Sequence, residues 1–151
     1  MLSRIPSATV RTRPELKMRL FTLALVSALV FAADAAALEL HTVSRKGVNT
    51  TSRLANFDCG FRNNYLGNDD LLLKCGGPDG FAKARYDFYL PKSLYGTPTM
   101  HVYGERLCCS SSIVKKTLFH VNGRHYRIVI KASRRVRYDV RSVSLSYYVK
   151  T

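Results

Sequence analysis

Two histidines, His120 and His125, are the residues of this 151-residue chain best suited by type and spacing to acid–base chemistry. They flank Asn122-Gly123, a dipeptide typical of two-residue hairpin turns, because both central residues of a type I′ turn need positive φ. This turn predicts that His120 lies directly opposite His125, with Cβ atoms about 5 Å apart. Two facing imidazoles beside Arg127 would suit an acid–base pair for phosphodiester cleavage, a weak metal site or a pH-sensitive patch.

The simpler interpretation of the two histidines is a pair of solvated side chains on a polar sheet face, and we favour it. Acid–base work also needs a carboxylate, and Glu105 is the only glutamate after residue 56. The sequence contains no glycine-rich phosphate loop, zinc-ligand spacing or nucleophile elbow. It therefore predicts no cofactor, no metal and no named reaction, and it favours a non-catalytic protein.

Basic residues dominate the charge, with 24 Lys and Arg against 10 Asp and Glu and a formal net charge of +14. Such a surface attracts polyanions, including nucleic acid, anionic lipid and acidic glycans. Tyrosines are interleaved with the basic residues near the C-terminus, and Tyr and Arg on a sheet can stack on bases. The alternative is solubility combined with strand propensity. The candidate polyanion-binding residues are Arg124, Arg127, Lys131, Arg134, Arg135, Arg137 and Arg141.

Four cysteines, Cys59, Cys75, Cys108 and Cys109, predict two disulfides in a short exported chain. A bond between the adjacent Cys108 and Cys109 would close a strained ring and cross-link nothing. If both lie on a strand, their side chains point to opposite faces, so we expect each to bond a different upstream cysteine. A metal site or free thiols are the other possibilities.

The first 37 residues have the pattern of a signal peptide. An uncharged apolar run at 20–33 follows Lys17 and Arg19 and precedes small residues suited to cleavage. The run is too short to span a membrane, and Met18 is an alternative start. A mitochondrial presequence is the competing interpretation. Secretion into the extracellular space is therefore expected.

Residues 38–56 are polar and lack a sustained period, so we expect a flexible N-terminal arm. Asn49 begins an Asn-Thr-Thr sequon and is a candidate glycosylation site. The ordered domain is expected to cover 57–151, and within it Asn68–Lys74 is expected to form one short helix with Asn68 as its cap.

The remainder predicts strands. Residues 81–90 place Ala82, Ala84, Tyr86, Phe88 and Leu90 on one face, with Lys83, Arg85 and Asp87 on the other. Over 136–149 the apolar positions change parity, which predicts a bulge near Arg141-Ser142. The expected fold is α+β and β-rich, with five to six antiparallel strands in a small sheet and at most one short helix.

The hairpin Ile113–Lys131 is expected to organise this domain. Its predicted register pairs Val121 with Arg124 and Phe119 with Tyr126. One face then carries the apolar side chains Phe119, Val121, Tyr126, Ile128 and Ile130. The other face carries Lys116, His120, His125 and Arg127.

The layout also resembles a known family. The motif Phe57-Asp58-Cys59 soon after the leader, and a β-rich remainder, resemble candidate secreted effectors of powdery-mildew and related plant-pathogenic fungi. The segments 118–121 and 126–130 are similar to the core hairpin of that family. The resemblance implies a ribonuclease-like α+β fold without catalytic residues, and a role in virulence. It also leaves two sites of action open, outside the host cell or inside it after translocation.

Three functions follow for comparison. The first is a secreted, non-catalytic effector-like protein that binds a host component, either a protein or RNA, as a monomer. The second is a secreted RNA-binding protein or ribonuclease that uses His120, His125 and the basic residues. The third is a cationic antimicrobial or toxin-like protein, argued from charge and disulfides alone.

Overall fold

The computed structural model describes residues 37–109 and 113–151, and these residues form one compact unit, Ala37–Thr151. The regular structure of this part of the chain consists of strands, with no helix. The strands are β1 (Leu38–Lys46), β2 (Ser52–Asn56), β3 (Cys59–Asn63), β4 (Leu71–Cys75), β5 (Phe81–Tyr89), β6 (Leu94–Cys108), β7 (Ile113–Asn122), β8 (His125–Ser133) and β9 (Arg137–Lys150).

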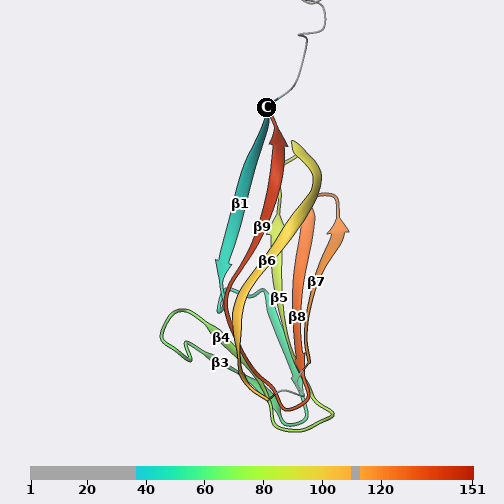
Figure 1. The fold of residues 1–151 in the computed structure, drawn as a ribbon. Helices are drawn as coiled ribbons and strands as arrows, with labels where there is room; N and C mark the ends of the chain where they lie inside the picture. Colours follow the sequence, from blue (N-terminus) through green and yellow to red (C-terminus); the bar gives the residue numbers. More distant parts are fainter. Residues whose placement is uncertain (1–36, 110–112) are drawn as a thin grey trace, which may run out of the picture. The chain divides into compact units, whose positions relative to one another are not determined.

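The strands make two antiparallel sheets (Figure 1). The four-stranded sheet has the order β2-β5-β8-β7. The five-stranded sheet is built on β9, which pairs with β1 and β4 along one side and with β6 along the other, while β3 pairs with β4. Figure 1 shows the C-terminus beside the start of β1, where Thr151 N donates to Ala37 O at 3.1 Å.

The core contains the alternate side chains of both sheets. In β5 the predicted inner face is confirmed, because Ala82, Ala84, Tyr86 and Phe88, with the following Leu90, are all buried. The other buried apolar residues include Leu71, Leu73, Tyr126, Ile128, Ile130, Val136, Tyr138, Val140, Val143 and Leu145. Tyr86 reaches across this core and donates to Gly47 O at 2.6 Å, and its burial raises its pKa.

The predicted bulge in β9 is confirmed. Tyr103 of β6 pairs with Ser142 and Gly104 pairs with Val140, so Arg141 is the extra residue. The Arg141 carbonyl accepts the backbone N–H of Gly47 at 2.9 Å. A Cβ on Gly47 would lie 1.9 Å from Val140 O, so only glycine fits where the chain turns past the bulge.

The predicted helix at Asn68–Lys74 is wrong, because Leu71–Cys75 is strand β4. Strand β4 pairs with β3 on one side and β9 on the other, and three successive leucines, Leu71, Leu72 and Leu73, are buried. A short continuous apolar run is typical of a strand covered on both faces. This burial determines the conformation of the segment, and the helix-capping signal at Asn68 does not. The α+β assignment is corrected to an all-β arrangement over the described residues, with more strands than expected and two sheets.

The predicted flexible arm at 38–56 is also corrected. Strand β1 pairs with β9 from Leu38 to Lys46, and β2 pairs with β5 from Ser52 to Asn56. Both strands add to a sheet edge, so backbone hydrogen bonds order them even though most of their side chains are exposed. The predicted leader 1–37 lies, except for Ala37, outside the described residues.

The disulfide pattern differs from the expected one. Cys59 and Cys75 lie directly opposite each other on β3 and β4 and form a disulfide. Cys108 and Cys109 are joined to each other, the pairing that the strand argument disfavours. The reason is that β6 ends at Cys108, and Cys109 has a φ of 75°, so the two residues do not alternate as strand neighbours do.

Candidate functional site

The β7–β8 hairpin folds as a hairpin, but its register is one residue away from the predicted one. Asn122 pairs with His125, which leaves Gly123 and Arg124 as the two turn residues, with Gly123 at a φ of 44°. A glycine with positive φ at the first central position is typical of a type II′ turn. Val121 is the extra residue of a bulge, so Phe119 pairs with Arg127.

This register places Phe119 and Val121 on the outer face, where they are 48% and 42% exposed, and not in the core as predicted. It also separates the two histidines, because His120 pairs with Tyr126. The His120 ring stacks on Tyr126 at 4.8 Å between centroids, and His120 Nε2 lies 2.8 Å from Gly123 O. The proposed acid–base pair of facing imidazoles is therefore wrong.

Glu105 is on β6 in the other sheet, where its carboxylate pairs with Arg141 at 2.7 Å. It contributes nothing to the hairpin. The residues expected to form a His–Glu–Arg constellation are thus distributed over two sheets.

His125 instead belongs to a buried cluster around Asp87. His125 Nε2 lies 2.5 Å from Asp87 Oδ1, and Arg127 Nε donates to the same oxygen at 2.7 Å. Thr51 donates its hydroxyl to Asp87 Oδ2, and Tyr89 stacks on the His125 ring at 4.5 Å. The Asp87 side chain is 7% exposed and the His125 side chain 13% exposed.

The Asp87 carboxyl is held ionised. Burial by itself raises its pKa, but hydrogen bonds from Arg127, Thr51 and His125 and the charge of Arg127 lower the pKa to about 2. A permanent negative charge at Asp87 fixes the Nε edge of the Arg127 guanidinium. The two terminal nitrogens of Arg127 remain for other partners.

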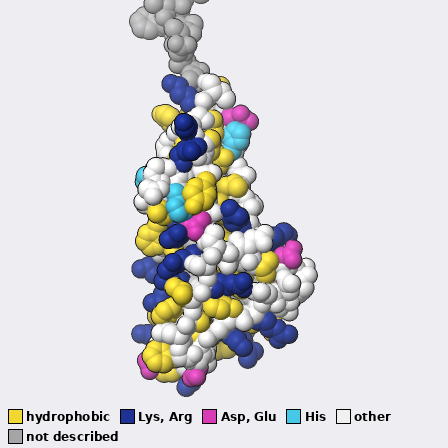
Figure 2. Space-filling view, turned by 180° about the vertical axis from the view of Figure 1, so that it is seen from behind, with side chains coloured by type: hydrophobic (Ala, Val, Ile, Leu, Met, Phe, Trp, Pro, Cys, Tyr) yellow, Lys and Arg dark blue, Asp and Glu magenta, His cyan; other side chains and the backbone are white. Residues whose placement is uncertain are grey.

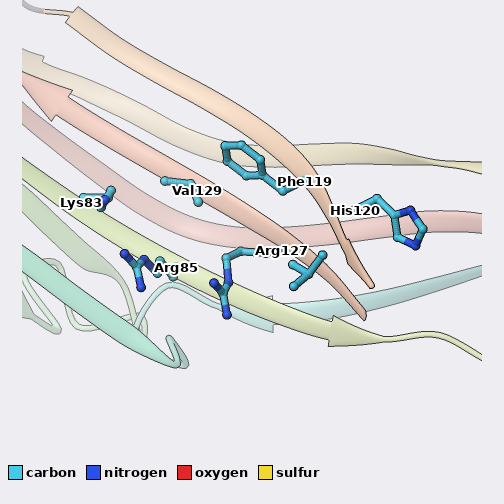
Figure 3. Close-up of a pocket in the computed structure, with 7 residues that line it drawn as sticks. Lys83, Arg85, Phe119, His120, Arg127 and Val129 are labelled. Carbon is cyan, nitrogen blue, oxygen red and sulfur yellow. The ribbon is translucent and has the colours of Figure 1, made fainter. Parts of the chain in front are cut away.

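Arg127 also borders a shallow depression of about 380 Å³ on the outer face of the four-stranded sheet. Strand β5 supplies Lys83 and Arg85, and the hairpin supplies the rest: Phe119, His120, Val121, Arg127 and Val129. Figure 3 shows the three cationic side chains along one side, Phe119 on the other, and the His120 ring at the end away from Lys83. We call these seven residues the basic depression.

Aromatic and cationic side chains alternate beyond this depression. Lys83 and Lys131 lie over the ring of Phe81, at 5.9 and 5.0 Å from its centroid. Figure 2 shows many Lys and Arg side chains and few Asp and Glu side chains on the side of the molecule turned away in Figure 1.

The structure brings together only part of the predicted polyanion-binding set. Arg127 and Lys131 lie on the outer face of β8, in register with Asp87 and Lys83 of β5. Arg124 is in the hairpin turn, and Arg134 and Arg135 are in the β8–β9 turn with positive φ. Arg137 and Arg141 belong to β9, in the other sheet.

Sequence reasoning missed Lys83 and Arg85 as site residues. Their signal was present in the alternation of residues 81–90, which placed both on the polar face. What was missing was the pairing of β5 with β8, whose paired residues lie 36 to 52 positions apart in the sequence, a contact that the local pattern does not specify.

Asn49, the candidate glycosylation site, is exposed in the turn between β1 and β2. Within residues 37–109 and 113–151 no group of three or more His, Cys, Asp or Glu side chains is arranged to hold a metal ion. The same part of the chain contains no helix long and apolar enough to cross a membrane.

Comparisons with known proteins identify no family. No family model matches the chain, and no curated protein or solved structure is significantly similar to it.

Proposed function

We propose that this chain is a secreted, effector-like protein that acts without catalysis by binding a host component through the basic depression, and that the component is single-stranded RNA. Secretion is inferred from the leader-like sequence of residues 1–37, and the effector class from the resemblance of the sequence. The binding role is inferred from the four-stranded sheet.

The observation that carries the proposal is the pairing of Phe119 with Arg127 across β7 and β8. Phe119 is a half-exposed ring, and beside it Arg127 has its Nε held by Asp87. An aromatic ring next to fixed cations suits a stacked base with its phosphates on the basic side chains. Lys83 and Arg85 extend the cationic side of the depression and would bind a further phosphate.

The arrangement of the histidines supports a non-catalytic role. Cleavage by paired imidazoles needs both within reach of the same phosphodiester. His125 is held by Asp87 and stacks on Tyr89, while His120 stacks on Tyr126 and lies 2.8 Å from Gly123 O, so the two rings have different partners.

The test is a titration of labelled single-stranded RNA with the protein at low and physiological salt. Phe119→Ala removes the stacking platform and is expected to weaken binding about tenfold or more. Lys83→Ala and Arg85→Ala are expected to weaken binding and to reduce its salt dependence.

Two control variants change the same side-chain types on the five-stranded sheet. Arg106→Ala removes an equal charge from exposed β6, and Tyr95→Ala removes an aromatic ring that is 55% exposed. Binding that is equally reduced by Arg106→Ala would mean generic attraction to a positive surface. Absence of binding would overturn the RNA proposal, and cleavage of the RNA in the same samples would overturn the non-catalytic one.

A further inference from the structure

Asp70 and Asp139 are two fully buried carboxyl groups on the five-stranded sheet, away from the basic depression. Both have 0% exposed surface. Asp139 of β9 pairs with Leu72 of β4, and Asp70 stands two residues before Leu72. Since side chains two residues apart share a face, the two carboxyls are diagonal neighbours on one face of the sheet.

Each carboxyl has one oxygen bonded and one without a partner. Asp70 Oδ2 accepts the backbone N–H of Leu66 at 2.9 Å, and Asp139 Oδ2 accepts Arg141 Nε at 3.2 Å. Both Oδ1 atoms are buried and have no hydrogen-bond donor. A buried carboxylate oxygen without a hydrogen-bond donor lowers the stability of the fold. A proton shared between the two neighbouring carboxyls would supply the missing hydrogen bond to both oxygens.

Two cations belong to the surroundings of the pair. Arg62 of β3 pairs with Leu72, in the same cross-strand row as Asp139, and its guanidinium lies over the Tyr65 ring at 5.2 Å. Arg141 is the cation in contact, and it is shared with Glu105, whose carboxylate lies 2.7 Å from Nη2. Arg141 also contacts the hydroxyl of Tyr103, which lies 3.5 Å from Arg141 Nη1. Burial raises the pKa of Asp139, and Asp70 raises it further, against the opposite effect of Arg141.

We propose that Asp70 and Asp139 share one proton and that this proton latches the loop 64–70 onto β9. The loop depends on Asp70 for its closure, because the Asp70 carbonyl accepts Asn64 N at 2.9 Å and its carboxyl accepts Leu66 N. The neighbouring Asp69 carbonyl accepts Val48 N from the β1–β2 connection at 3.1 Å. Loss of the proton leaves Asp70 and Asp139 both negatively charged where the loop 64–70 meets β9. Their repulsion then releases the loop from β9.

The sign of the pH effect follows from a raised pKa in the folded state. The stabilisation is complete below the ordinary carboxyl pKa of about 4 and is lost as the pH rises through the raised pKa of Asp139. The latch is therefore closed in acid and opens toward neutral and alkaline pH.

The experiment measures the urea midpoint of the full chain at about pH 5 and about pH 8, together with amide exchange at Leu66 and Val48. The wild-type midpoint is expected to fall as the pH rises, and both amides to exchange about tenfold faster relative to their intrinsic rates. Asp70→Asn places an amide donor where the proton lies, so its midpoint is expected to lose this dependence. Glu105→Gln, which alters an exposed carboxylate beside the pair, is expected to retain it.

A wild-type midpoint that does not fall between these pH values would overturn the proposal, as would an undiminished fall in Asp70→Asn. If Asp70→Asn does not fold, Asp139→Asn makes the reciprocal test, because its amide donates to Asp70. Restoration of the wild-type midpoint at about pH 8 by calcium alone would overturn the shared proton in favour of a bound cation.

Discussion

Asp87 accepts two hydrogen bonds on one oxygen, from Arg127 Nε at 2.7 Å and from His125 Nε2 at 2.5 Å. One buried carboxylate thus joins the basic depression to the aromatic stack of Tyr89 and His125. The orientation of Arg127 and the position of His125 depend on the same charge, so both respond to any change at Asp87.

Acid should weaken the fold through Asp87. Its pKa is about 2 in the folded protein against an ordinary 3.8, so its stabilising contribution is present above pH 4 and is lost as the pH falls toward 2. The shift corresponds to about 2 kcal/mol of unfolding free energy. Urea unfolding at several acid pH values measures it, and Asp87→Asn should remove most of this dependence. If the unfolding free energy of Asp87→Asn fell in acid as much as that of the wild type, Asp87 would not be the group responsible.

The two histidines should differ in their effect on stability. His125→Ala deprives the buried Asp87 of a donor and should lower the unfolding free energy by about 1–3 kcal/mol. His120→Ala removes an exposed contact with Gly123 O and should cost less than about 1 kcal/mol. Equal losses in the two variants, measured by urea denaturation, would argue against the observed register.

Gly47→Ala should be among the most destabilising single substitutions. A Cβ at this position would lie 1.9 Å from Val140 O of β9 and 2.7 Å from Leu71 N of β4, both of them backbone atoms. We expect a loss of about 3 kcal/mol or more. Gly60→Ala is the matched control, because its Cβ would meet only the flexible end of Lys74 at 3.5 Å. A mild Gly47→Ala phenotype in thermal unfolding would mean that the β1–β2 connection can move away from the bulge.

Removal of the two disulfides should have unequal effects. The Cys59–Cys75 bond spans 16 residues, so replacing both cysteines by serine should cost about 3 kcal/mol in the chain-entropy account. The same change at Cys108 and Cys109 opens no such loop and should cost much less. Denaturant midpoints of the two double variants decide this, and the reverse order would show that Cys108–Cys109 has a structural role beyond loop closure.

Local patterns predicted the parts of the fold that depend on alternation. The inner face of β5 and the bulge at Arg141 were both accessible because side-chain period and burial agree there. The hairpin was predicted as a hairpin, but the turn moved from Asn122-Gly123 to Gly123-Arg124. A one-residue change of register exchanges the faces of β7, so Phe119, predicted to be a core residue, instead lines the basic depression.

Long-range pairing was the part that the sequence did not reveal. Strand β1 is ordered by its pairing with β9, which lies about a hundred residues away in the sequence. Strand β4 is a strand because it pairs with β3 on one side and β9 on the other. The cluster around Asp87 likewise collects Thr51, Asp87 and His125 from three strands or their flanks. None of these contacts has a signature within a window of a few residues.

The position of β9 sets the order in which the chain can fold. Strands β1, β4 and β6 all precede β9 in the sequence, and each needs it as a partner. During synthesis these three strands emerge with unpaired edges, whereas β2, β5, β7 and β8 can pair before β9 is made. The five-stranded sheet is therefore expected to close last, and until β9 is made its open edges are free to pair with other chains.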